Sequence, residues 1–377
     1  MKKYLKTALA ALLIVIMVCS VACSQQKAET PVPAANTQQS TTQQSTTQQA
    51  PAAAEKPAET TTQKTEEKPA EQPQAAAEPE MKQEKRDIYL GVGSLGGAFY
   101  PLGQGMATLV NQYSGGLTMT PEVTGGAVDN VRLVGNKEVD IGITAENNAY
   151  DGLAGQGSYT EKYELMGIGR LHPSALHIVV LDDSPIKTIE DLRGKKVTLG
   201  AAGSGGIPVA QVLLAAYGMT FDDIVANYLP TADGYTQLGD GNIDASIGLF
   251  GMPGSACMEL ASTKKIRFID IDQDKIDQIV AEYPYYAQVD ISADLYGTDK
   301  GTSTIGTVNC LIVRPDLEEN VVYWLAKSIY DNLDELHSIN ETSKTITQES
   351  GAKCSVPLHP GAKRYWEEVF GKDYFGK

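Results

Sequence analysis

The sequence is poor in the residues on which catalysis and metal binding commonly depend. It has 377 residues, of which only four are histidine and five are cysteine. The chain contains no Cys-x-x-Cys pair and no His-x-x-x-His pair, the spacings that are typical of zinc sites. A Gly-x-Ser-x-Gly nucleophile elbow is also absent, because residues 202–206 read Ala-Gly-Ser-Gly-Gly. We therefore expect a protein that is not an enzyme and that has neither a cofactor nor a metal site.

Positive charge is scarce as well. Lysine and arginine together number 31 against 47 acidic residues, which gives a net charge of −16 at pH 7. Binding to nucleic acid or to an anionic membrane surface needs clustered basic side chains, because their contacts release counterions. The composition argues against both partners, but it leaves open the sign of the potential inside a ligand cleft.

The N-terminal apolar run is too short for a comfortable membrane span of about 20 residues. It covers residues 8–18 and follows Lys2, Lys3 and Lys6, a pattern typical of a secretory signal peptide. Small residues then precede Cys23, and this arrangement resembles a bacterial lipobox. We expect a signal peptide over residues 1–22 and lipidation of Cys23, the first residue of the mature chain. An ordinary cleaved signal with an incidental cysteine is the alternative.

Aliphatic and aromatic residues are nearly absent from residues 23–86. This stretch consists largely of Gln, Thr, Ala, Pro, Glu and Lys. It can bury too little apolar surface to offset the entropy lost on ordering. We expect a lipidated, disordered tether over residues 23–86, which holds a folded head away from a membrane.

Three of the five cysteines, Cys257, Cys310 and Cys354, fall in the head. An odd number leaves at least one thiol unpaired unless two chains are linked. We interpret these cysteines as small buried hydrophobic residues, with a single disulfide as the alternative.

From residue 87 onward, short apolar runs alternate with amphipathic stretches. Predicted strands cover residues 87–92, 118–124, 139–144, 165–171, 176–181, 196–201, 225–229, 243–250 and 266–271. Predicted helices cover residues 102–113, with Pro101 at the start, and 127–136, 207–217, 232–239, 253–263 and 273–282. Such alternation is typical of parallel sheets covered by helices. Two such sets in a head of this size predict two α/β lobes.

Three glycine-rich loops, at residues 91–97, 125–126 and 203–206, each join a predicted strand to a predicted helix. The first matches the Gly-x-Gly-x-x-Gly dinucleotide fingerprint. The acidic residue expected about 20 positions later is missing, since the first acid is Glu122. We instead interpret the loops as places where helix N-terminal amides approach an anionic group of a ligand. Tight turns without a ligand are the alternative.

The last of these loops carries the most specific expectation. We predict that the amides of residues 204–206 hold one polar end of the ligand, while Ser94 and Gly97 hold the other end from the first lobe. Arg170 is one of the few basic residues close to the inferred cleft.

Several motifs along the head resemble the TAXI-type solute receptors of tripartite ATP-independent periplasmic (TRAP) transporters. Residues 93–103 read GSLGGAFYPLG, residues 122–126 read EVTGG and residues 139–143 read VDIGI. Residues 177–180, 189–197, 203–205 and 357–362 continue the resemblance, which thus covers essentially the whole head in order.

This resemblance implies the type II periplasmic-binding-protein fold, an α/β fold of two lobes joined by two hinge strands near residues 176–181 and 305–313. The first lobe would comprise residues 87–180 and 305–377, and the second residues 181–304. The implied ligand is an amino acid such as glutamate or glutamine, or another small carboxylate. The implied membrane partner is a TRAP-type permease. We expect the receptor to be a monomer.

The loops and the resemblance together define a set of candidate ligand-binding residues. These are Gly93, Ser94, Gly97, Phe99, Tyr100, Thr124, Gly125, Glu146, Asn147, His172, Ser204, Gly205, Gly206, Phe250 and Thr307. Glu146 is predicted to contact a ligand amine or cation, or else to be a carboxylate favoured by a helix N-terminus. His172 stands where the family commonly has tyrosine and could bind ligand, whereas for His177 we expect a structural role.

Two other functional classes remain open. The abundant acidic residues allow an enzyme with a catalytic carboxylate pair, such as a hydrolase. A receptor of the same fold could also report ligand to a membrane sensor without transport. The features above favour an exported solute receptor, anchored by its N-terminal lipid to the outer face of the cell membrane.

Overall fold

The computed structural model describes residues 85–375. The predicted signal peptide, Cys23 and nearly all of the predicted tether lie outside the described residues. Among the helices within this described part, none combines the length and the apolar character needed to cross a lipid bilayer.

The framework of the fold is a mixed ten-stranded sheet. Along its main path the strand order is β2-β1-β3-β10-β4-β7-β5-β6, while β8 pairs with β4 and β9 with β10. The strands are β1 (Arg86–Gly91), β2 (Leu117–Glu122), β3 (Ile141–Ala145), β4 (Met166–Leu181), β5 (Lys196–Thr198), β6 (Val225–Asn227), β7 (Ala245–Gly251), β8 (Ile266–Phe268), β9 (Ala287–Ile291) and β10 (Thr302–Val313).

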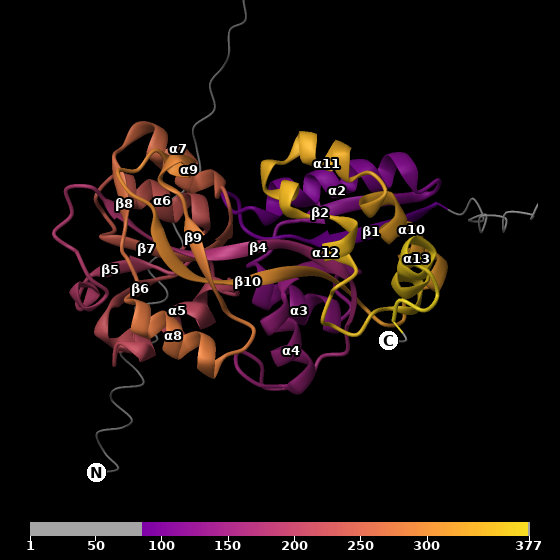
Figure 1. The fold of residues 1–377 in the computed structure, drawn as a ribbon, viewed down its shortest axis with the longest axis horizontal. Coiled ribbons are helices and arrows are strands. Elements are labelled where there is room, and N and C mark those ends of the chain that lie inside the picture. Colours follow the sequence, from indigo (N-terminus) through magenta and orange to yellow (C-terminus); the bar gives the residue numbers. More distant parts are fainter. Residues whose placement is uncertain (1–84, 376–377) are drawn as a thin grey trace, which may run out of the picture. The chain divides into compact units, whose positions relative to one another are not determined.

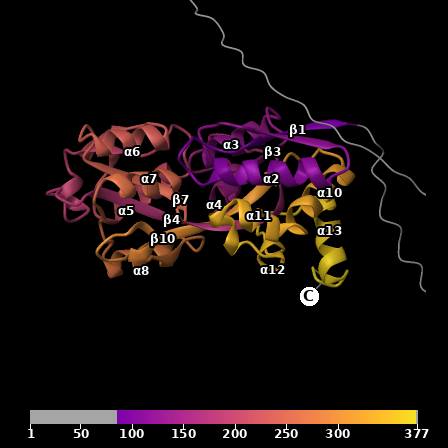
Figure 2. The same ribbon diagram turned by 90° about the horizontal axis from the view of Figure 1, so that it is seen from above.

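Two lobes share the long antiparallel strands β4 and β10, which run side by side from one lobe into the other (Figure 1). The first lobe contains β1–β3 and the helices α2 (Phe99–Tyr113), α3 (Ala127–Gly135), α4 (Glu146–Ala154), α10 (Glu319–Tyr330), α11 (Leu333–Ile339), α12 (Gln348–Gly351) and α13 (Pro360–Phe370). The second lobe contains β5–β9 and the helices α5 (Gly206–Ala216), α6 (Thr231–Gly239), α7 (Ser255–Thr263), α8 (Gln273–Glu282) and α9 (Ala293–Tyr296). Figure 2 shows the helices of each lobe gathered around its own part of the sheet.

Each lobe has its own apolar core. In the first lobe, Leu102 and Met106 of α2 are fully buried in a cluster with Leu90 of β1. In the second lobe, Val209 and Leu213 of α5 are buried against Ile247 of β7. Because each core closes within one lobe, the contacts between the lobes are left to loops and helix ends.

The pattern-based expectation of parallel sheets is correct for part of each lobe, because β8 and β9 of the second lobe pair antiparallel with β4 and β10. Strands β1–β3 pair in parallel, and so do β5–β7. The central ladders, in which β10 pairs with β3 and β4, and β4 with β7, are antiparallel. The sheet is therefore mixed and covered by helices, and the two lobes share two long strands, as the resemblance implied.

One predicted break does not exist. Residues 165–171 and 176–181 were expected to be separate strands. In the structure both belong to β4, and Pro173 pairs with Val308 where the register of β10 shifts. The irregularity of β10 at this point accommodates the missing amide.

The starts of α3 and α8 are as expected, and the other predicted helix starts differ by one or two residues. Helix α2 begins at Phe99, so Pro101 lies inside its first turn, where a proline needs no amide donor. The lobe boundaries predicted at residues 180/181 and 304/305 fall near the end of β4 and within β10, and they stay a prediction.

Candidate ligand-binding site between the lobes

A cavity of about 50 Å³ lies between the two lobes. It is lined by the loop before α2, by the N-terminal ends of α3, α5 and α6, and by β4, β7 and β10. The lining residues are Gly93, Ser94, Gly97, Ala98, Phe99, Gly125, Gly126, Ala127, Ser174, Ser204, Gly205, Thr231, Leu249, Phe250, Gly251 and Asn309. None of these described residues carries a charged side chain.

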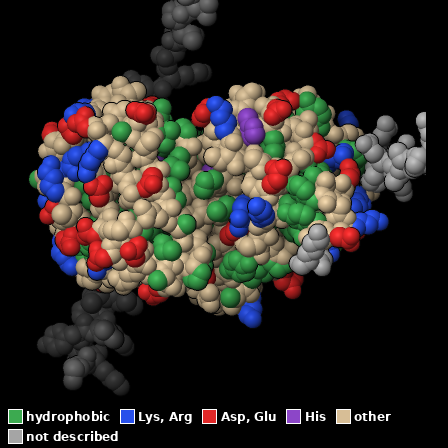
Figure 3. All heavy atoms as spheres, in the orientation of Figure 1, with side chains coloured by type: hydrophobic (Ala, Val, Ile, Leu, Met, Phe, Trp, Pro, Cys, Tyr) green, Lys and Arg blue, Asp and Glu red, His purple; other side chains and the backbone are tan. Residues whose placement is uncertain are grey.

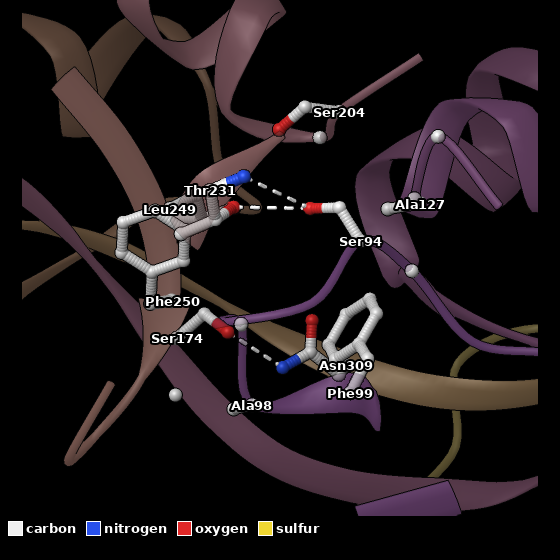
Figure 4. Close-up of a pocket in the computed structure, with 16 residues that line it drawn as sticks. Ser94, Ala98, Phe99, Ala127, Ser174, Ser204, Thr231, Leu249, Phe250 and Asn309 are labelled. Atoms are coloured by element: carbon white, nitrogen blue, oxygen red, sulfur yellow. Dashed lines mark hydrogen bonds between the residues drawn. The ribbon is translucent and has the colours of Figure 1, made fainter. Parts of the chain in front are cut away.

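Eight of the predicted site residues line this cavity. They are Gly93, Ser94, Gly97, Phe99, Gly125, Ser204, Gly205 and Phe250. Figure 4 shows the rings of Phe99 and Phe250 on opposite sides of it, with the Ser94 hydroxyl directed toward Thr231. The structure thus brings the three glycine loops together at one place, although they are far apart in the sequence.

The other predicted residues do not line the cavity. Tyr100 packs on the core of the first lobe. Gly206 begins α5, and its amide donates to the Ser204 hydroxyl at 3.2 Å. Asn147 and Thr307 are buried, and the Thr307 hydroxyl donates to Asn147 Oδ1 at 3.4 Å. Their predicted contacts with ligand would have to be indirect.

Thr124 has a structural part in forming the site. Its hydroxyl donates to Asn130 Oδ1 at 2.7 Å and accepts from the Gly126 amide at 3.1 Å. The Asn130 amide group donates in turn to the carbonyls of Gly91, Val92 and Ile143. Because Asn130 is fully buried, it holds the first two glycine loops in a fixed relation to β3.

Helix N-termini provide the electrostatics of the cavity. Helices α2, α3 and α5 each begin there, and none of them has a side-chain cap. The amides of Ala98, Phe99, Ala127 and Gly205 have no acceptor among the described residues. These amides and the helix dipoles favour an anion without any basic side chain.

Other helix N-terminal amides are already used to hold the lobes together. The Gly203 carbonyl accepts from Val128 and Asp129 at 3.0 and 3.2 Å. On the opposite side, Leu95 and Gly96 of the first lobe accept from the amides of Ala232 and Ala256 at 3.1 and 3.0 Å. The lobes are therefore in a closed arrangement.

The side chains of Ser94 and Thr231 add a further link between the lobes. Their hydroxyl oxygens share a hydrogen bond of 3.1 Å, and the Thr231 amide donates to Ser94 Oγ at 3.3 Å. Both contacts are drawn in Figure 4. Ser94 is thus held by α6 at the rim of the cavity.

Glu146 forms an ion pair with Arg170 instead of lining the cavity. Arg170 donates to its two carboxylate oxygens at 2.9 and 2.7 Å, and the Ser355 amide donates to Oε1 at 3.2 Å. This charge-assisted pair raises the pKa of Arg170. Both charges are satisfied inside the first lobe, and Glu146 lies in the first turn of α4, where the dipole favours it.

The two predicted histidines are buried differently. His172 has no exposed surface, and neither ring nitrogen has a partner among residues 85–375. It packs edge-on against Phe99, with ring centroids 5.9 Å apart, and burial lowers its pKa to about 3. His177 is also buried, but it is hydrogen-bonded to Ala175 and Tyr296. The structural role expected for His177 fits this arrangement.

Sequence reasoning missed several lining residues, most importantly Ser174, Thr231 and Asn309. Asn309 is an amide within the apolar run of β10, and Ser174 follows Pro173 in β4. A polar residue inside a fully buried strand was the available signal, because such a residue needs a partner. Thr231 follows Pro230 at the start of α6 and gave no comparable signal.

The three cysteines within the described residues form no disulfide. Cys257 and Cys310 are buried and Cys354 is half-buried, all as free thiols. The reading of these residues as small buried hydrophobic residues therefore fits Cys257 and Cys310 best.

Comparison with known proteins identifies the family. The model of the NMT1-like family matches residues 90–369, which is most of the chain. The chain belongs to the NMT1-like family. This NMT1-like protein is also similar to a putative aliphatic sulfonates-binding protein of Escherichia coli (strain K12), with 38% identity over 80 residues. That match covers 21% of this chain and 25% of the relative, so the chain spans about a quarter of the length of the curated relative.

Solved structures resemble the NMT1-like protein more distantly. One is the alkanesulfonate-binding protein SsuA from Xanthomonas axonopodis pv. citri bound to MOPS, with 15% identity, a TM-score of 0.43, and coverage of 76% of this chain and 80% of that one. Another is a putative L-cystine ABC transporter from Listeria monocytogenes, with 14% identity, a TM-score of 0.43, and coverage of 77% and 98%.

Proposed function

We propose that this protein is an exported solute receptor that captures a small organic anion between its lobes and delivers it to a membrane permease. The anion is a small carboxylate or sulfonate. The motif resemblance to TAXI-type receptors favours a TRAP permease as the partner, and the sulfonate class is suggested by the curated relative. The protein acts by binding, without catalysis.

The convergence of uncapped helix N-termini on an uncharged cavity is the observation that carries this proposal. Four amides there have no acceptor within the described part of the chain, and they come from α2, α3 and the start of α5. Each buried amide left without an acceptor costs about 1–3 kcal/mol. A bound anion would satisfy several of them at once, and the lobes supply them from both sides only when closed.

Cavity size limits the ligand. A volume of about 50 Å³ accommodates about three to five water-sized groups. Acids the size of acetate or glycolate fit the closed arrangement, whereas glutamate and glutamine would hold the lobes further apart. Of the ligands implied by the resemblance, the small carboxylates therefore agree best with the site.

Location follows from the N-terminal residues. A signal peptide over residues 1–22, lipidation of Cys23 and a tether would place the receptor on the outer face of the cell membrane. At this location the receptor would bind the ligand outside the cell membrane and then pass it to the permease.

Binding and closure can be measured together on the detergent-solubilised full-length chain. Titration with a panel of small carboxylates and sulfonates should raise the melting temperature by several degrees at 100 times Kd, because ligand binds only the folded state. The same ligand should reduce the radius of gyration in X-ray scattering, since closure joins the lobes. A panel in which no small anion shifts the melting temperature would contradict the proposal.

A further inference from the structure

Ser174 of β4 and Asn309 of β10 line the cavity where these two strands lie side by side, and they are called its floor below. Both side chains are buried, with 1% and 0% of their surface exposed. The Asn309 amide nitrogen donates to Ser174 Oγ at 2.7 Å, a contact drawn in Figure 4. The pair thus links the two strands that the lobes share.

The orientation of the Asn309 amide is determined by its neighbours. Its Nδ2 also lies 2.9 Å from the His172 carbonyl oxygen. A carbonyl can only accept, so the group that faces it must be the NH₂. The Asn309 Oδ1 is therefore turned the other way, toward the cavity (Figure 4), and it has no partner among the described residues.

The Ser174 hydroxyl has an unused donor, whereas Asn309 has an unused acceptor. Its oxygen accepts from Asn309, so its own proton remains free to donate. No other side-chain partner of Ser174 Oγ exists within residues 85–375, and Ser174 lines the cavity. The floor therefore presents one unused acceptor and one unused donor.

We infer that this floor recognises a hydroxyl group, so that the ligand is a small hydroxylated anion. The inference rests on the proposed function, which assigns the anionic end of the ligand to the helix N-termini. A hydroxyl oxygen accepts from Ser174 and donates to Asn309 through one atom. An ammonium group cannot accept, and a keto oxygen cannot donate.

The lack of acidic side chains around the cavity also favours a hydroxy acid over an amino acid as the ligand. An ammonium group held away from water needs an anionic partner or several carbonyls. None of the described lining residues is acidic, and Glu146 is occupied by Arg170. A zwitterion would bury its positive charge uncompensated, whereas a hydroxy acid adds no second charge. The amino-acid ligands implied by the resemblance are thus disfavoured.

Matched probes test the hydroxyl directly by calorimetry on the full-length chain. One series is glycolate, glycine and acetate, and the other is isethionate, taurine and ethanesulfonate. In the series whose anionic group fits, the hydroxyl compound should bind at least about tenfold more tightly than the other two. The two series distinguish a carboxylate from a sulfonate ligand.

A Ser174→Ala variant removes the donor and leaves the Asn309 bond to the His172 carbonyl in place. The advantage of the hydroxyl compound over the unsubstituted acid should fall to less than about threefold. Ser262→Ala is the matched control, because Ser262 is exposed on α7 and donates only to the Glu259 carbonyl. This control should keep the full advantage.

The outcomes separate the two proposals. If no member of either series binds, the proposed function fails. If the anions bind but glycine or taurine equals or exceeds its hydroxyl counterpart, the inference is wrong and the receptor proposal stands. An unchanged hydroxyl advantage in a folded Ser174→Ala protein also overturns the inference.

Discussion

Two buried histidines on β4 differ in the way their ring nitrogens are satisfied. The Ala175 carbonyl can only accept, so His177 Nδ1 carries the proton and donates to it at 2.9 Å. Nε2 of the neutral ring therefore accepts from the Tyr296 hydroxyl at 2.8 Å, and the Tyr296 oxygen accepts from the Gly254 amide at 2.7 Å. His172 has no such partners among the described residues. The cost of removing each imidazole should differ accordingly.

Leucine substitutions at the two positions test this difference. His177→Leu should lower the free energy of unfolding by about 1–3 kcal/mol, because Ala175 and Tyr296 lose their partner. His172→Leu should be nearly neutral or stabilising at pH 7, since it removes two unsatisfied nitrogens. Urea denaturation measures both values. An equal loss in His172→Leu would show that the ring has a partner, such as bound water.

The same variants report on acid stability. Burial lowers the pKa of His172 from 6.5 to about 3, so between these values the unfolded chain binds the proton and the folded one does not. Protonation then favours unfolding, and stability falls as pH drops below 6.5. From pH 7 to pH 5 this histidine should cost about 2 kcal/mol, which the His172→Leu protein should not lose. The shift of His177 to about 4 acts in the same direction.

At the scale of elements, the loop before α5 depends on the absence of a side chain at Gly205. Its φ of −65° is accessible to any residue, so the backbone does not require glycine. A Cβ there would lie 2.8 Å from Ala127 Cβ and 3.1 Å from Asn148 Nδ2, both in the first lobe. Glycine is needed because the two lobes approach closely at this point.

Gly205→Ala should therefore weaken ligand binding about tenfold or more while leaving the fold intact, because the methyl group opposes closure. Ala127→Gly in the same chain should recover most of the affinity by removing the opposing methyl group. Calorimetry, with circular dichroism as the folding control, measures both. Unchanged affinity in the single variant would mean that ligand binds without this closure.

The surface of the head shows no separation of charge on the face drawn in Figure 3, where acidic and basic side chains are interspersed. Anion binding at the proposed site would depend on the local helix amides, because the net charge of −16 opposes it. Exposed ion pairs such as Lys137–Asp316 contribute little to stability.

For the whole molecule, membrane attachment is predicted to depend on Cys23 alone. Wild-type protein should enter the detergent phase on Triton X-114 partitioning and carry a lipid mass on its N-terminal peptide, because acyl chains bury apolar surface. Cys23→Ser should stay in the aqueous phase, with Cys257→Ser as the matched control. A Cys23→Ser protein that still partitions into detergent would contradict the proposed anchor.

The amino-acid sequence determined the local features of this protein. Apolar spacing predicted α3, α5 and α6 to within one or two residues, since helix periodicity is a short-range property. The glycine loops could be placed before helices because strand, turn and helix signals lie next to one another in the chain. In the same way, composition alone predicted that residues 23–86 have too little apolar surface to fold.

Only the tertiary structure decided which of these loops meet and what they do there. Ser94 and Thr231 are 137 residues apart, as are Asn309 and the His172 carbonyl, and their pairing depends on the assembled sheet. The Val128 amide donates to the other lobe, whereas the Ala127 amide has no acceptor among the described residues, and this difference depends on how the lobes close. These hydrogen-bond partners are brought together by packing between distant segments of the chain. Local secondary-structure propensity therefore cannot predict them.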